Sequence, residues 1–107
     1  MKTQFLGLAE VDEQRIKAGK LYREFLRVPS MSAGLYVLPV ESSDPQKPHH
    51  EDELYYVVRG RARFNADSED REVAAGDTIF VAAEVEHRFY DITEELAVLV
   101  FFAPAES

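Results

Sequence analysis

The chain has 107 residues, a length that suits one domain, and its 20 acidic and 12 basic side chains give a formal charge of −8. This charge, with no run of Lys and Arg to offset it, argues against partners that present phosphates, such as nucleic acids and anionic membranes. Cysteine is absent, so disulfides are excluded and any metal must bind to nitrogen and oxygen ligands.

No targeting or spanning segment is visible in the sequence. Residues 1–11 lack the apolar centre of a signal peptide. The longest nearly unbroken apolar run, residues 96–103, is far shorter than the ~20 residues that cross a bilayer. We therefore expect a cytoplasmic protein that does not contact membranes.

In chain order, the first predicted element is a helix over residues 10–20. Asp12 is a suitable N-cap, acidic residues precede basic ones, and Gly19 is a natural stop. The rest of the chain consists of short segments rich in Val, Tyr, Phe, Leu and Ile, separated by turn-forming residues. We expect strands over residues 21–28, 33–40, 53–59, 61–66, 71–74, 78–82, 86–91 and 95–102.

Many short strands with turn signals between them indicate an all-β sandwich, jelly roll or barrel. Gly60 lies between two predicted strands without a loop, so we expect one strand that bends there and continues. No internal repeat or linker divides the chain. The expected organisation is one domain over residues 1–107, in which a helix and a strand within residues 10–28 come first.

The three histidines of the chain each stand at the start of a predicted strand. His49 and His50 follow a polar loop over residues 41–48, and His87 begins a later strand. Because strand side chains alternate between faces, His49 and Glu53 share one face and His50 points to the other. Two imidazoles and one carboxylate form a site for Fe(II), Mn, Zn, Ni or Co. The pattern therefore predicts a metal site of His49, Glu53 and His87, with His50 as the rival of His49.

Each of these residues also has a plainer interpretation. His49 and His50 suit an exposed polar loop, and His87 suits a half-buried position with a hydrogen bond to a backbone carbonyl. Glu53 could instead form an ion pair at the rim of the sheet, with Arg59, Arg61 or Arg63.

Aromatic side chains are the candidates for a ligand pocket, although most aromatics in a small domain belong to its core. Tyr55 and Phe89 have the strand parity to face the metal, and Tyr36 and Phe64 are further candidates. Asp91 shares the parity of His87, so it is either a hydrogen-bond acceptor behind a histidine ligand or a turn residue.

Two stretches resemble the two motifs of the cupin superfamily: PHHEDELYYVVRG (residues 48–60) and GDTIFVAAEVEHRFYDI (residues 76–92). In the first, Glu53 stands six intervening residues before Gly60, and His49 takes the place of the second motif histidine. Lys47 stands where the family has its first histidine.

In the second motif Gly76 and His87 match the family pattern. Ala82, Glu84 and Asp91 replace its proline, glycine and asparagine. The resemblance covers about residues 30–103, which would be the core of the domain.

The resemblance implies a small antiparallel jelly roll, or double-stranded β-helix, with a short N-terminal helix. It also implies one divalent metal ion and oxygenase, isomerase, decarboxylase or lyase chemistry on a small polar molecule. A non-catalytic module that senses a small molecule or a metal, and a structural barrel with a vestigial site, are the alternatives. Small cupins pair as homodimers, and residues 21–28 and 98–102, apolar on both strand faces, give an independent hint of pairing.

Overall fold

The computed structural model describes residues 2–45 and 47–107. One helix, α1 (Leu8–Ala18), is followed by strands only, as the all-β prediction requires. The strands are β1 (Tyr22–Val28), β2 (Met31–Leu38), β3 (Asp52–Ala66), β4 (Glu69–Ala74), β5 (Thr78–Val81) and β6 (His87–Ala103).

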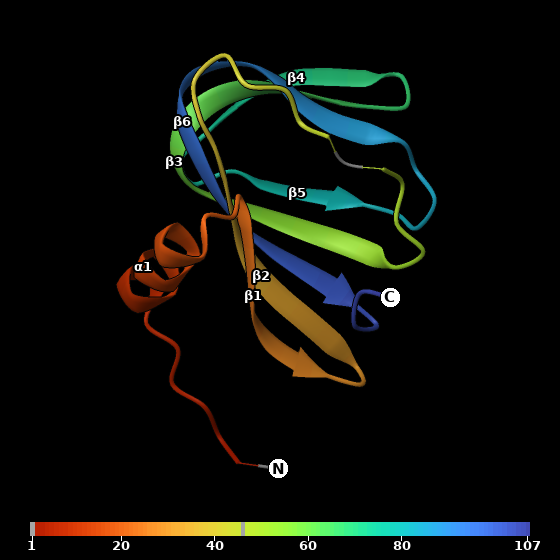
Figure 1. Cartoon of the computed structure of the whole chain (residues 1–107). Coiled ribbons are helices and arrows are strands. Elements are labelled where there is room, and N and C mark those ends of the chain that lie inside the picture. Colours follow the sequence, from red (N-terminus) through yellow and green to blue (C-terminus); the bar gives the residue numbers. More distant parts are fainter. Residues whose placement is uncertain (1, 46) are drawn as a thin grey trace.

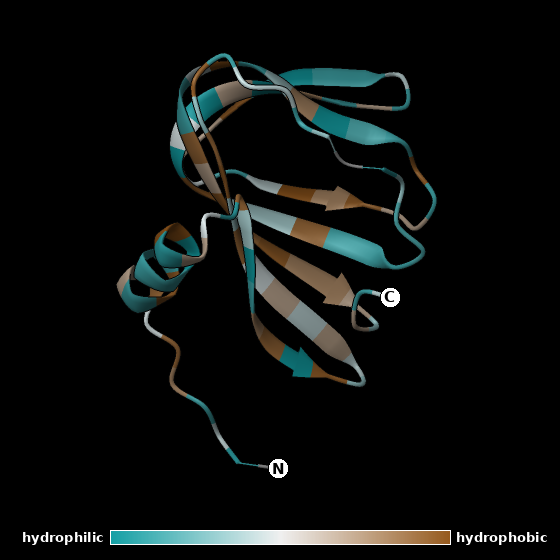
Figure 2. Cartoon of the chain, viewed as in Figure 1, coloured by the Kyte–Doolittle hydropathy of each residue, from teal (hydrophilic) through white to brown (hydrophobic). Residues whose placement is uncertain are grey.

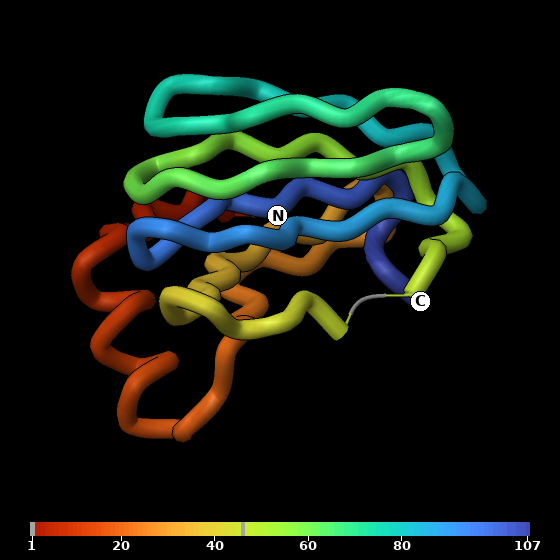
Figure 3. Tube along the Cα trace, turned by 90° about the horizontal axis from the view of Figure 1, so that it is seen from above, coloured from red at the N-terminus to blue at the C-terminus, as the bar shows by residue number. Residues whose placement is uncertain are grey.

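All strand pairs are antiparallel, in the order β1-β2-β6-β3-β4, with β5 also on β3. The long strands β3 and β6 pair along nearly their whole length and bend together. The other edge of β3 pairs first with β5, over residues 53–56, and then with β4, over residues 61–66. Figures 1 and 3 show the result, a sheet curled over on itself so that β4 and the first part of β6 lie opposite β1 and β2.

Gly60 makes the bend in β3 that the sequence predicts. Its φ is +97°, and a Cβ at this position would lie 2.1 Å from the carbonyl oxygen of Glu95. The register between β3 and β6 shifts three times between Val57 and Arg63. The two predicted segments on either side of Gly60 are therefore one strand, and glycine is required because two backbones touch at the bend.

The prediction of two separate strands over residues 86–91 and 95–102 is wrong, because both belong to β6. Arg63 pairs with Tyr90 and Arg61 pairs with Glu94, so a two-residue step on β3 corresponds to a four-residue step on β6. The β6 strand therefore contains a bulge at this point. Asp91 stands at the bulge with a φ of +47°. The bulge interrupts the alternation of faces, so that Phe89 and Ile92 are both buried and Asp91 is exposed.

The helix begins two residues earlier than predicted. Gly7 is its N-cap, without a side-chain hydrogen bond, and Gly19 ends it in the left-handed conformation as expected. Asp12 is thus not the cap: it lies inside the helix and forms an ion pair with Arg15 at 2.9 Å. A helix start needs only extended backbone at the cap, which glycine also supplies.

One face of α1 covers the outer side of the sheet. Val11 packs with Leu35, Val37 and Ala97, and Phe25, Val58 and Leu99 contact this second small core. Part of the apolar surface of β1 and β6 that hinted at a dimer is therefore covered within the chain. The α1 helix has 11 residues, and the described residues contain no helix of the length and apolarity that a membrane crossing needs.

The main core fills the space inside the curled sheet. Side chains along the inner faces alternate with polar ones, which gives the strands of Figure 2 their banded colouring. The largest fully buried side chains of this core are Tyr55, Phe89, Leu38, Ile92 and Leu96. Four polar residues among those described are buried as well: Ser32, Glu51, Glu53 and His87.

Candidate metal centre

The starts of β3 and β6 are held together by the turn that follows β5. The amide of Glu84 donates a hydrogen bond to the carbonyl of His49 at 2.7 Å. The amide of Ala83 donates to the Asp52 carboxylate at 2.9 Å. These bonds bring His49 and His87, which are far apart in the sequence, to the same end of the sheet.

Glu84 keeps the turn that the family motif makes with glycine. Its φ is +69°, in the left-handed region that glycine adopts without strain. A residue with a Cβ there costs roughly 1–2 kcal/mol. The backbone amide of Glu84 still donates to His49, and the Glu84 carboxylate contacts Nδ1 of His50 at 2.7 Å. The departure from the motif therefore leaves the backbone of the site intact.

His49, Glu53 and His87 converge as predicted, although His49 lies in the loop before β3 and not on the strand. Oε1 of Glu53 lies 2.9 Å from Nε2 of His87 and 3.9 Å from Nε2 of His49. One ligand atom from each residue lies within 4.8 Å of the others. Atoms that each lie about 2.1 Å from one ion can be at most about 4.2 Å apart, so small side-chain shifts suffice to hold one metal ion.

Glu53 is the most unusual member of this group. Its side chain is 1% exposed, and neither carboxylate oxygen has a hydrogen-bond partner among the described residues. Its closest polar contact is the ion pair with Nε2 of His87 at 2.9 Å. A buried carboxylate without partners costs several kcal/mol unless a cation compensates it. The donor set therefore fits a divalent metal ion, which would bind both the charge and the free lone pairs.

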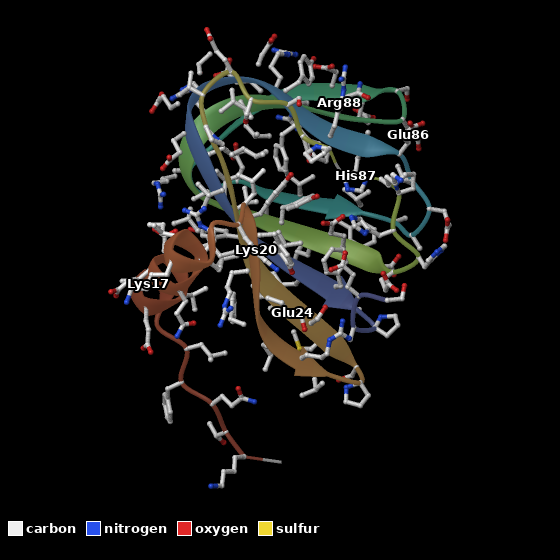
Figure 4. The ribbon with its side chains drawn as sticks, viewed as in Figure 1. Lys17, Lys20, Glu24, Glu86, His87 and Arg88 are labelled. Atoms are coloured by element: carbon white, nitrogen blue, oxygen red, sulfur yellow. The ribbon has the colours of Figure 1, made fainter. Side chains whose placement is uncertain are left out.

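His87 is oriented to act as a ligand through Nε2. Its Nδ1–H donates to the carbonyl of Val85 at 2.8 Å, which leaves Nε2 to face Glu53 and the Tyr55 hydroxyl. Burial lowers the pKa of His87, but Glu53 and the Val85 carbonyl raise it by more, so that the net shift is upward. In Figure 4 His87 lies between the ribbons of β6 and β5, whereas its neighbours Glu86 and Arg88 are exposed.

The two adjacent histidines point in different directions. His49 is largely buried, with an exposed side-chain fraction of 18%, and belongs to the group. His50 is 76% exposed and its Nδ1 lies 2.7 Å from Glu84. The Glu84 hydrogen bond and charge raise the pKa of His50. The structure thus brings His49, and not its rival, to Glu53 and His87.

The alternative in which Glu53 pairs with a rim arginine does not occur. Each of the three candidate arginines is engaged elsewhere. The pairs are Arg59 with Glu95, Arg61 with Glu72 and Glu94, and Arg63 with Asp70. Lys47, at the position of the missing motif histidine, is exposed, and the group contains three residues within the described part of the chain.

A cavity of about 240 Å³ opens beside His49. Apolar groups form most of its wall, and its lining residues are Tyr22, Tyr36, Pro45, His49, Val100, Phe102 and Glu106. The ring of Tyr22 occupies the space where a Cβ on Gly34 would lie, at 2.2 Å, so this wall depends on a glycine in β2. A larger cavity of about 370 Å³ lies along β4 and β5 and contains none of the three ligand candidates.

The predicted pocket residues separate into two groups. Tyr36 lines the cavity beside His49, and its hydroxyl donates to Asp44 at 2.7 Å. Tyr55 and Phe89 are fully buried in the core, with the Tyr55 hydroxyl 3.2 Å from Nε2 of His87. Phe64 is also a core residue, and it contacts the other cavity.

Asp91 is not brought to the histidine ligands. It is exposed at the β6 bulge, and the Nδ1 atoms of His87 and His49 face Val85 and Glu106 instead. The strand parity failed here because the bulge shifts the faces. Sequence reasoning missed Glu106 and Tyr22 altogether. Neither shares a motif or a strand with the ligands, so no local pattern signals them.

The comparisons with known proteins agree with this architecture. The family model of the cupin domain matches residues 34–103, and the chain belongs to the cupin family. An uncharacterised protein of Streptomyces coelicolor is 45% identical over 100 residues, covering 94% of this chain and 95% of that protein.

Solved structures show the same fold at low identity. The KdgF protein of a Halomonas species is 19% identical with a TM-score of 0.71, over 78% of this chain and 76% of that one. The DMSP lyase DddQ of Ruegeria pomeroyi is 17% identical with a TM-score of 0.70, over 94% and 65%. Both structures share only the fold with this chain, because identities this low do not indicate a shared activity.

Proposed function

We propose that His49, Glu53 and His87 bind one divalent metal ion, and that the chain is a small mononuclear metalloenzyme. The carrying observation is the Glu53 carboxylate, buried to 1% exposure without a hydrogen-bond partner among the described residues. Fe, Mn, Ni, Zn and Co all accept two imidazoles and one carboxylate, and the donor set does not choose among them.

The reaction that we propose is of the dioxygenase, isomerase or lyase type, on a small polar molecule. Three protein ligands leave positions on the ion for substrate or water, and a bound ion would supply a Lewis acid or, as iron, activate dioxygen. The cavity beside His49 provides room for a small molecule. Tyr36 and Tyr22 would contact it, while Tyr55 and Phe89 fix the floor under His87.

Metal analysis of the purified chain tests the site. We expect about one equivalent of metal after reconstitution with Fe(II), Mn, Ni, Zn or Co, and its loss in His87→Ala and His49→Ala. His50→Ala is the matched control, because it removes an adjacent imidazole that points away from the group. A wild-type protein that takes up none of these ions contradicts the proposal.

Catalysis needs a separate measurement on the metal-loaded protein. Oxygen consumption and product formation with a panel of small diketones, thiols and sugars distinguish the enzyme from the second candidate, a non-catalytic module that binds a small molecule or senses a metal. The mostly apolar wall of the cavity and the exposed Lys47 in place of a fourth ligand favour that second candidate. Saturable binding of a panel compound without turnover would select it.

We also propose that the chain pairs as a homodimer. Leu54, Tyr56 and Phe80 are exposed apolar residues on the paired strands β3 and β5, and Leu54 lies opposite Phe80. An apolar patch of this kind on a sheet is typical of an interaction surface. Analytical ultracentrifugation should give a dimer for the wild type and a monomer for Leu54→Glu. A wild-type monomer at micromolar concentration contradicts this proposal.

A further inference from the structure

The segment that follows β6 folds back to the metal centre. After Ala103 it passes the turn between β1 and β2, where the amide of Ala105 donates to the Pro29 carbonyl at 3.4 Å. The guanidinium of Arg27 donates to the Glu106 carbonyl. Figure 1 shows this end of the chain beside the end of β6, on the side of the sheet where β2 begins.

Two buried polar side chains hold the backbone of this segment. Ser32 is completely buried, and its hydroxyl accepts the amide of Glu106 at 2.9 Å. Glu51 is 5% exposed, and its carboxylate accepts the amide of Ser107 at 3.1 Å. Buried polar groups are costly without partners, and here the segment supplies partners to both. Glu106 is therefore fixed in place from both sides.

The Glu106 side chain reaches His49. Its Oε2 lies 3.2 Å from Nδ1 of His49, and the carboxylate is only 27% exposed. A carboxylate accepts hydrogen bonds and does not donate when ionised, so Nδ1 is the nitrogen that carries the proton. Nε2, on the opposite edge of the ring, is then the unprotonated nitrogen, and it faces Glu53 at 3.9 Å.

Glu106 is not placed to be a fourth metal ligand, because it contacts Nδ1 of His49 and Glu53 faces Nε2. A metal ion held by Nε2 and Glu53 would be on the opposite edge of the ring from Nδ1, which Glu106 contacts. The Glu106 carboxylate instead contacts one edge of the His49 imidazole, and the nitrogen that would bind the metal lies on the other edge. Such outer carboxylates fix the ring orientation and raise the basicity of the ligand nitrogen.

We propose that Glu106 is a positioning residue of the metal centre, and that residues 104–107 are part of that centre because they hold Glu106 on Nδ1 of His49. The inference rests on the proposed metal-binding function. His87 has the same support from the Val85 carbonyl, so each histidine ligand is oriented by an acceptor on its Nδ1.

Metal competition against a chelator tests the inference, with Co(II) as the probe for its absorption spectrum. We expect Glu106→Ala to bind about 10- to 100-fold more weakly, with an altered Co(II) spectrum. Glu106→Gln should lie closer to the wild type, because its amide oxygen still accepts from Nδ1–H. Glu95→Ala, which removes an exposed carboxylate paired with Arg59, is the matched control and should leave both readouts unchanged.

Imidazole ¹⁵N NMR of the metal-free protein adds a readout that does not depend on metal. The wild type should show His49 with its proton on Nδ1, and Glu106→Ala should lose this preference. If Glu106→Ala keeps both the tautomer and an affinity within about twofold of the wild type, the inference is wrong while the metal site stands. If the wild type binds no metal, the proposed function is wrong and the role of Glu106 in a metal centre falls with it.

Discussion

β3 has two halves, before and after the bend at Gly60, and charged residues of the two halves, Glu53 in the first and Arg61 and Arg63 in the second, have opposite environments. Before the bend, Glu53 is buried and its oxygens lack hydrogen-bond partners among the described residues. After the bend the strand carries exposed arginines, each with an acidic partner on β4 or β6. The pairs include Arg61 with Glu72 and Glu94, and Arg63 with Asp70.

The difference indicates which charged residues lower the stability of the fold and are therefore candidates for a functional role. Exposed ion pairs are screened by water and contribute little, so the paired arginines are a solvated surface. The buried Glu53 carboxylate, whose oxygens lack hydrogen-bond partners among the described residues, is destabilising in the absence of a cation. Perturbed or uncompensated charge in a buried position is typical of a functional site, and the paired charges of the second half are not.

Substitution at the bend between the two halves should have the largest effect on the stability of the fold. We expect Gly60→Ala to lower the free energy of unfolding by about 3 kcal/mol or more, because strain at positive φ and a backbone clash add together. Gly76→Ala is a matched control, since its φ is +96° but nothing lies within 4 Å of the added Cβ. Urea unfolding of both variants measures this, and equal losses would show that the contact with Glu95 is unimportant.

Metal should stabilise the first half strongly. At a free metal concentration of 100 times Kd the free energy of unfolding should rise by about 2.7 kcal/mol. For a chain of this size that corresponds to a rise in Tm of roughly 10–20 °C. Differential scanning calorimetry with metal and with a chelator measures the shift. Glu53→Gln should show no metal-dependent shift, and the same shift in that variant would exclude Glu53 as a ligand.

Without metal, the same variant should be more stable than the wild type. Glu53→Gln removes the buried charge, and the amide can donate to Nε2 of His87, so we expect a gain of about 1–2 kcal/mol. Urea unfolding in chelator gives the value. Glu95→Gln, which removes an exposed carboxylate of β6 that pairs with Arg59, serves as the control and should not gain stability. A loss in Glu53→Gln would mean that the carboxylate is compensated in the metal-free state.

The smallest effect on stability should come from removing the titratable carboxylate of Asp70, which pairs with Arg63 in the second half of β3. Hydrogen bonds from Tyr90 and Arg63 lower the pKa of Asp70 from its ordinary value of 3.8. A lowered pKa in the folded state stabilises the fold above the ordinary pKa, and this contribution is lost as the pH falls through the lowered value. Asp70→Asn should therefore be slightly less stable at neutral pH and equal to the wild type at strongly acid pH. Thermal melts across this range test the trend, and a difference that grows with acid contradicts it.

The sequence by itself determined the parts of the site that follow from local periodicity. Alternation predicts that His49 and Glu53 lie together and that His50 points away, and the structure places the residues so, although His49 and His50 precede the start of β3 at Asp52. Gly60 marks the bend because only glycine tolerates the close backbone approach there. The motif spacing supplied His87 and the cupin fold.

Only the tertiary structure decided the features that depend on contacts between distant segments. The bulge in β6 placed Asp91 at the surface, because extra residues on one strand interrupt the alternation of faces and leave no sequence signal. Val11 of α1 covers the outer sheet, which the apolar pattern alone attributed to a partner. Glu106 reaches His49 through a segment held by Ser32 and Glu51, since chain folding and not periodicity brings these residues together.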